Sequence, residues 1–287
     1  MKYGLYIPNF GDGISVDLLV DFARVAEEAG WDGFFLWDHV AGYAVDFVDP
    51  WLALTAIALN TSRLRIGTTV TPLPRRRPWK LARETATLDH LSGGRLVLGV
   101  GIGLGDAEWD DLGEETEPRA RGAMLDEALD VVTGLWSGDP FSYEGDHYHV
   151  HEAHFLPRPV QKPRVPIWVG GFWPNKAPFR RMARWDGMFP LFEVWEPDKV
   201  VPLLREAVDF VKAHRAEDAG PFDVVVTGDT PGDKPEIASE ITAAHADAGA
   251  TWWLEAIAPY CFGMDLDAPW PIEPLRARIR QGPPKRS

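Results

Sequence analysis

Short apolar runs alternate with longer amphipathic stretches along almost the whole chain. Eight runs have the length and composition of buried strands: residues 3–7, 34–37, 64–70, 95–100, 167–169, 188–191, 222–227 and 252–256. In the stretches that follow them, apolar residues recur at helical spacing: 15–29, 49–59, 78–91, 118–136, 174–184, 197–214, 235–248 and 269–280. Eight strands, each followed by a helix, form the pattern of a (β/α)8 TIM barrel. We therefore predict one α/β barrel domain spanning residues 1–287.

The alternation pauses between the fourth and fifth predicted strands. Residues 137–166 contain seven glycines and prolines around a stretch of alternating polarity. Turn residues on both sides of alternating positions are typical of a β-hairpin. The sequence therefore predicts a surface hairpin inserted between strands four and five of the barrel.

An open, doubly wound parallel sheet is the alternative for this order of elements. Its dinucleotide-binding form has a glycine-rich turn directly after the first strand, at the start of a helix, and an acidic residue about 20 residues later. The loop at residues 9–13 lacks that spacing. The glycines at positions 99, 101, 103 and 105 instead fall at every second position. The pattern favours the barrel.

The charge balance excludes several classes of partner. The chain has 29 Lys and Arg against 43 Asp and Glu, a formal net charge of −14. Nucleic acids and anionic membranes need clustered positive charge, so neither is expected as a partner. Cys261 is the only cysteine, which excludes an internal disulfide. The first residues lack a signal-peptide core, and the longest apolar stretch, 51–59, is too short to span a membrane. We expect a soluble, cytoplasmic protein.

Polar side chains follow two of the predicted strands. In a TIM barrel the carboxyl ends of the strands carry the active site, so these side chains are candidates for it. Asp38 and His39 follow the second strand. An imidazole donates a hydrogen bond or exchanges a proton near neutral pH, and Asp38 would set its tautomer. A histidine in an ordinary surface turn is the alternative. Thr69 and Val70 lie in the small, hydroxylated end of the third strand, which lets a planar ligand lie against the backbone.

Glycines shape two further strand ends. Gly101 and Gly103 belong to the alternate glycines after the fourth strand, which leave one face bare for the close approach of a ring. Gly170 and Gly171 begin a turn that leads from the fifth strand directly into a helix. Free backbone N–H groups and the helix dipole make such a turn a seat for phosphate. A tight turn that simply requires glycine is the alternative.

Histidines in the predicted hairpin offer a possible metal site. His147, His149 and His151 would share one face of a strand, which is compatible with metal binding. Tyr148 and Val150 would occupy the opposite face, and this alternation is typical of a hairpin with one side in water. We therefore predict no metal site.

Several motifs together resemble the bacterial luciferase-like monooxygenase family. In the first half of the chain they are Thr-Val-Thr-Pro-Leu-Pro at 69–74, the segment 83–95 with its Leu-Ser-Gly-Gly-Arg end, and Gly-Val-Gly at 99–101. In the second half they are Pro-Arg-Pro-Val-Gln-Lys-Pro at 157–163 and Pro-Ile-Trp-Val-Gly-Gly at 166–171. Asp-Gly at 186–187 also fits. The resemblance spans residues 1 to about 190.

The resemblance implies a TIM barrel that uses a flavin-type coenzyme, either FMN with O₂ or the deazaflavin F420 for hydride transfer. It also implies a homodimer and, for FMN chemistry, a separate flavin reductase as partner. By resemblance His39 lies near the coenzyme ring, and Thr69 and Val70 form a bulge behind it with a cis peptide bond between them.

The resemblance also assigns the remainder of the coenzyme site. Gly101 and Gly103 line the coenzyme, and Gly170, Gly171 and Asn175 take its phosphate. The chain departs from the family pattern in one place. Phe-Trp-Pro-Asn stands at 172–175, where the family often has a serine or threonine soon after the glycines.

These observations lead to one main hypothesis and two alternatives. The main hypothesis is an oxidoreductase that passes a hydride or activated oxygen from its coenzyme to an apolar organic substrate. His39 would donate a proton or hydrogen bond beside the ring, and Asp106 or Glu108 is a secondary acid candidate. The alternatives are a flavin-binding barrel without catalysis and a metal-dependent barrel hydrolase, which would require His-x-His at a strand end. We expect loops such as 102–117 and 192–198 to determine the substrate.

Overall fold

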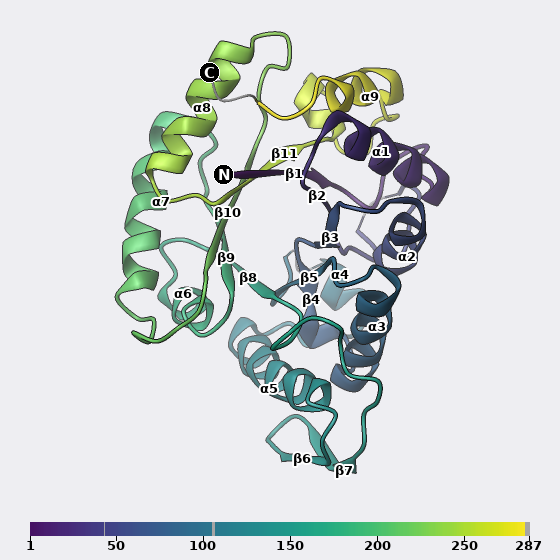
Figure 1. The fold of residues 1–287 in the computed structure, drawn as a ribbon, viewed down its shortest axis with the longest axis vertical. Helices are drawn as coiled ribbons and strands as arrows, with labels where there is room; N and C mark the ends of the chain where they lie inside the picture. Colours follow the sequence, from purple (N-terminus) through teal and green to yellow (C-terminus); the bar gives the residue numbers. More distant parts are fainter. Residues whose placement is uncertain (43, 105–106, 285–287) are drawn as a thin grey trace.

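Eight parallel strands close into a barrel in the computed structural model, which describes residues 1–42, 44–104 and 107–284 (Figure 1). In barrel order the strands are β1 (Lys2–Ile7), β2 (Gly33–Leu36), β3 (Arg65–Thr68), β5 (Leu96–Gly101), β8 (Ile167–Phe172), β9 (Gly187–Leu191), β10 (Asp223–Gly228) and β11 (Trp252–Ala256). The parallel pairing of β11 with β1 closes the ring. The predicted TIM barrel is confirmed.

The third predicted strand is interrupted near its end. β3 stops at Thr68, and the short strand β4 (Thr71–Pro72) resumes the pairing with β5. Between these strands the peptide bond that joins Thr69 and Val70 is cis, which confirms the expectation drawn from the resemblance.

Helices surround the barrel on its outside (Figure 1). They are α1 (Val16–Ala29), α2 (Pro50–Asn60), α3 (Pro78–Leu91), α4 (Ala107–Asp110), α5 (Pro118–Trp136), α6 (Lys176–Met182), α7 (Pro197–Lys212), α8 (Pro235–Asp247) and α9 (Ile272–Arg280), with 3₁₀ turns η1 (Leu73–Arg75) and η2 (Pro259–Phe262). The sequence pattern did not predict α4. Helix α9 begins three residues later than predicted, and the segment before it is held against the first barrel loop by a hydrogen bond from Trp270 N to Asp12 O.

Local signals explain where several helices begin and end. Ser15 Oγ accepts a hydrogen bond from Leu18 N at the start of α1, and Gly30 ends that helix with a φ of 87°. The Asp49 carboxylate accepts from the first free N–H groups of α2. These caps anchor the helices whose preceding loops carry site residues.

The predicted hairpin is confirmed as β6 (Phe141–Glu144) and β7 (His149–Ala153), an antiparallel pair beyond α5 (Figure 1). Glu127 of α5 accepts hydrogen bonds from three backbone N–H groups in the turn that joins β6 and β7. His149 pairs with Glu144 at 2.9 Å on the exposed side of the hairpin. Within the described ranges, no group of three or more His, Cys, Asp and Glu side chains is arranged to hold a metal ion.

Large aromatic side chains fill the barrel beneath its carboxyl end. Phe35, Trp168 and Trp252 are fully or almost fully buried there, and the Trp168 ring lies 5.0 Å from Phe35 and 5.4 Å from Trp252. A Cβ atom on Gly187 would lie 2.4 Å from the Trp168 ring, so only glycine fits beside it. The aromatic layer therefore forms a solid floor under the open end of the barrel.

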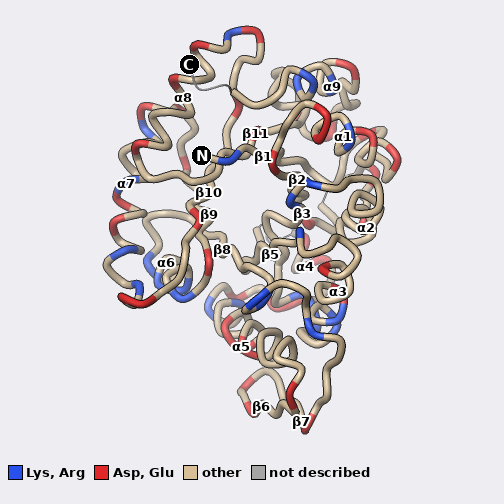
Figure 2. The backbone as a smooth tube through the Cα atoms, in the orientation of Figure 1, with Lys and Arg blue, Asp and Glu red and all other residues tan. Residues whose placement is uncertain are grey.

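Charged residues are spread over the outer helices and loops (Figure 2). No helix among the described residues is long and apolar enough to cross a membrane.

Candidate active site

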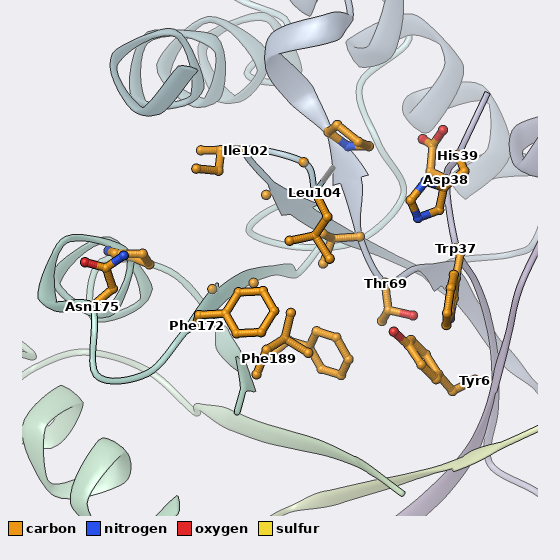
Figure 3. Close-up of a pocket in the computed structure, with 18 of the residues that line it drawn as sticks. Tyr6, Trp37, Asp38, His39, Thr69, Ile102, Leu104, Phe172, Asn175 and Phe189 are labelled. Atoms are coloured by element: carbon orange, nitrogen blue, oxygen red, sulfur yellow. The ribbon is translucent and has the colours of Figure 1, made fainter. Parts of the chain in front are cut away.

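A cavity of about 670 Å³ opens at the carboxyl ends of the barrel strands. Every barrel strand, or the loop after it, contributes to the wall. Figure 3 shows part of this lining. Asn175 lies on one side of the cavity, and Trp37, Asp38 and His39 lie on the opposite side. This is the end of the barrel at which the fold predicts the active site.

Most of the residues predicted from the sequence meet in this cavity. The lining includes Asp38, His39, Thr69, Val70, Gly101, Gly103, Gly170, Gly171 and Asn175. Glu108, on α4, lies behind His39 and contacts it. Asp106, the other acid candidate, lies outside the described residues.

His39 is held at the cavity edge from two directions. Asn9 is fully buried, and its side chain donates to the His39 carbonyl at 2.8 Å and accepts from the His39 N–H at 3.0 Å. His39 Nδ1 lies 3.2 Å from a Glu108 carboxylate oxygen. An ionised carboxylate only accepts hydrogen bonds, so Nδ1 is the donor in this pair. Nε2 is then the ring nitrogen left to exchange a proton or a hydrogen bond with a ligand.

The surroundings of Glu108 favour its ionised form. Its side chain is 5% exposed, lies 2.9 Å from Arg75 Nη1, and accepts hydrogen bonds from the N–H groups of Val40 and Ala41. Burial alone would raise the pKa of Glu108, but the hydrogen bonds from His39 and Val40 and the charge of Arg75 hold it below its usual value. This arrangement favours a role for Glu108 in orienting His39, and its role as an acid stays a prediction.

Asp38 does not set the tautomer of His39 as expected. Its buried carboxylate accepts a hydrogen bond from Thr71 Oγ1 at 2.7 Å and pairs with Arg76 at 2.8 Å and Arg75 at 3.4 Å. Because Arg75 contacts both Asp38 and Glu108, it ties the loop after β2 to α4. Asp38 supports the wall of the cavity.

Sequence reasoning missed Arg75, Arg76 and Asn9. Three consecutive arginines, 75–77, follow a proline-rich strand end, and this run was the available signal. Arginine side chains next to a barrel's active end need carboxylate partners when they are buried. Asn9 follows the first strand, but a single asparagine in a loop carries no comparable signal.

The bulge after β3 projects a side chain into the cavity. A Cβ atom on Gly101 would lie 2.8 Å from a Val70 methyl group, and one on Gly170 would lie 3.1 Å from the other. These two glycines therefore make room for Val70, rather than only leaving a bare strand face. Val70 forms the centre of a surface bounded by β5 and β8.

Two other glycines are required by packing inside the protein. Gly103 has a φ of 84°, and a Cβ atom there would lie 2.3 Å from the Trp109 ring. A Cβ atom on Gly171 would lie 2.4 Å from Pro178 Cβ, on α6. A side chain at Gly171 would therefore collide with α6 even without a ligand in the cavity.

The sequence model of the luciferase-like monooxygenase family matches residues 1–265. This chain belongs to that family. The match covers most of the chain, including every residue predicted for the site, and it confirms the resemblance seen in the motifs.

This luciferase-like protein is similar in sequence to an F420-dependent enzyme, and in fold to an F420-dependent and an FMN-bound one. An F420-dependent glucose-6-phosphate dehydrogenase from Microbacterium testaceum is 40% identical over 163 residues, which are 54% of this chain and 47% of that enzyme. The chain thus spans about half the length of this relative. The coenzyme F420 dependent tetrahydromethanopterin reductase from Methanopyrus kandleri has a TM-score of 0.75 at 17% identity, covering 98% of this chain and 96% of the other. The oxygenating constituent of 3,6-diketocamphane monooxygenase from Pseudomonas putida, in complex with FMN, has a TM-score of 0.68 at 22% identity, covering 80% and 67%. These two likenesses show a shared fold.

The cavity of the luciferase-like protein fits a flat, polar-edged ligand. Among the described residues, the buried Thr69 Oγ1 and Trp37 Nε1 have no hydrogen-bond partner within the protein. Both residues line the cavity, so a ligand there would satisfy two polar atoms whose burial is otherwise costly. An isoalloxazine or deazaflavin ring has an apolar face for Val70 and polar edges for these atoms.

Polar groups are also available at the Asn175 side of the cavity. Asn175 precedes α6, and its side chain makes no capping hydrogen bond to that helix. Arg181 lines the same cavity, and its guanidinium is held at 2.7 Å by Asp126. An amide and a fixed guanidinium suit the polar tail of a coenzyme.

Proposed function

We propose that this luciferase-like protein is an oxidoreductase that holds F420 or FMN in the cavity and acts on an apolar organic substrate. The observation that carries the proposal is the meeting of Val70, two unpartnered buried polar groups and the oriented His39 in one cavity. F420 is the first candidate, because the relative with 40% identity is F420-dependent. FMN, reduced by a separate flavin reductase, is the second.

Each predicted residue has a place in this proposal. Val70 supports one face of the ring, with Thr69 and Trp37 at its polar edges. The coenzyme lies between two walls that have little side-chain bulk. Gly101 and Gly103 belong to one wall, and Gly170 and Gly171 belong to the other. Asn175 binds the phosphate of the coenzyme. When bound, the coenzyme supplies the hydride or the activated oxygen.

His39 donates or accepts the proton that is transferred during this reaction. Glu108 fixes Nδ1 as the hydrogen-bonded nitrogen, so that Nε2 donates to or accepts from a substrate oxygen. Arg75 keeps Glu108 ionised, and Asn9 fixes the backbone of His39. The protein thus orients the His39 ring and leaves one of its atoms, Nε2, to exchange a proton.

The proposal includes a homodimer. Leu52 and Leu59 of α2 are 70% and 66% exposed, and their spacing of seven residues places them on one face of the helix. Exposed leucines that share one face of an outer helix favour association.

A coenzyme titration tests the proposal. Purified protein is titrated with F420 and with FMN, each oxidised and reduced, and binding is followed by absorbance and fluorescence. Saturable binding of one of them, with turnover of an organic substrate, supports the proposal. Binding without turnover across donors and acceptors indicates a non-catalytic flavin-binding barrel, and no binding of either coenzyme refutes the proposal.

A further inference from the structure

The part of the cavity formed by β1, β9, β10 and β11 has its own chemistry. Its lining is aromatic and aliphatic apart from one carboxylate: Tyr6, Phe189, Leu191, Trp195, Asp229, Tyr260 and Leu266. Trp195 is 74% exposed at the rim, although a large aromatic side chain is usually covered. This surface suits the apolar body of a substrate.

Asp229 is the charged member of this surface, and unlike Asp38 it is exposed. Among the described residues it has no ion-pair partner, whereas Asp38, the other lining carboxylate, pairs with two arginines. Tyr260 lines the same part of the cavity and supplies an aromatic face there. An unpaired carboxylate beside aromatic faces attracts a cation through charge and through the ring quadrupoles.

Positive charge in the described lining is confined to Arg181 and, when protonated, His39. Arg181 is on α6, and both oxygens of Asp126 bind its guanidinium. His39 is bound to Glu108. A phosphorylated sugar placed beside Asp229 would therefore meet a negative charge and no free cation. This contrasts with the substrate in the name of the glucose-6-phosphate dehydrogenase relative.

We infer that this end of the cavity binds the substrate, and that it selects an apolar molecule carrying a protonated amine, which Asp229 binds. The inference rests on the proposed function for the position of the coenzyme in the remainder of the cavity. Trp195 and Tyr260 cover the apolar body next to the amine, and phosphorylated or carboxylated substrates are rejected.

A matched series of ligands tests this inference. Cyclohexylmethylamine, cyclohexylmethanol and cyclohexanecarboxylate share one apolar body and differ in charge, and glucose 6-phosphate is added as a fourth probe. Their affinities are measured by isothermal titration calorimetry on the full chain, alone and with saturating F420 or FMN. We expect the amine to bind at least about fivefold more tightly than the alcohol and the two anions not to bind.

Two variants separate a local contact from overall charge. Asp229→Asn should remove the preference for the amine, whereas Asp233→Asn, the same charge change in the same loop outside the lining, should keep it. The inference is overturned if the alcohol or an anion binds as tightly as the amine, if none of the probes binds, or if both variants act alike. Coenzyme binding is read separately, so a protein that binds its coenzyme but prefers an anion refutes only the inference. A protein that binds neither coenzyme refutes the proposed function.

Discussion

Glu108→Gln removes a charge that four groups in the protein share. The carboxylate is bound by Arg75, His39 and the backbone N–H groups of Val40 and Ala41, and its side chain is 5% exposed. The amide keeps one acceptor oxygen, so part of the hydrogen bonding survives, and Asp38 still faces Arg75. Losing a charge-assisted partner in a buried setting costs about 2–3 kcal/mol. For a chain of this size that lowers the melting temperature by roughly 5–10 °C.

The pH dependence gives the same prediction an independent readout. The pKa of Glu108 lies below its usual value, so its stabilising effect is complete above the pKa of the unfolded chain, about 4.3. The effect is lost as the pH falls through the lower pKa of the folded state. The stability difference between wild type and Glu108→Gln should therefore shrink as the pH falls below about 5.

The assay is thermal and urea unfolding of both proteins across this pH range, with Asp110→Asn as the control. Asp110 is also on α4 and is exposed, so the control changes the net charge equally without touching His39. A Glu108→Gln protein as stable as the control at pH 7, or a difference that grows below pH 4, would refute the reasoning.

Three further predictions concern other parts of the molecule. His39→Ala should stay within a few degrees of the wild-type melting temperature while turnover falls about 10²–10⁴-fold, and normal turnover would remove His39 from the chemistry. Gly171→Ala should lower stability by about 1–3 kcal/mol without any coenzyme present, because its Cβ meets Pro178, and unchanged urea unfolding would contradict this. Leu59→Glu should convert the proposed dimer to a monomer in sedimentation experiments, whereas Leu156→Glu, at a similarly exposed leucine of 63%, should not. Equal behaviour of the two leucine variants would count against α2 as the interface.

The barrel could be predicted because it rests on periodicity that every element repeats. Helices α3 and α5 begin and end at the predicted residues, since proline begins both and polar or glycine-containing turns end them. Most site residues followed from the same logic, because parallel strand ends meet at one edge of a barrel whatever side chains they carry.

Pairings between distant side chains could not be predicted in this way. Seven carboxylates lie between residues 102 and 117, and periodicity does not indicate that Glu108 would meet His39, 69 positions away. The role of Asp38 depended on arginines that approach only after η1 folds back. The contact between Gly171 and Pro178 could not be predicted either, because it depends on how α6 packs against β8.

The central claim is that a flavin-type coenzyme binds in the cavity with its ring against Val70. A crystal structure of the protein soaked or grown with F420, and a second with FMN, tests this most directly. We predict ring density in contact with Val70, between the strands that carry Gly101 and Gly170, with Thr69 Oγ1 or Trp37 Nε1 hydrogen-bonded to its edge. Coenzyme density outside this cavity, or ring density that leaves Val70 and both polar atoms without contact, would contradict the account.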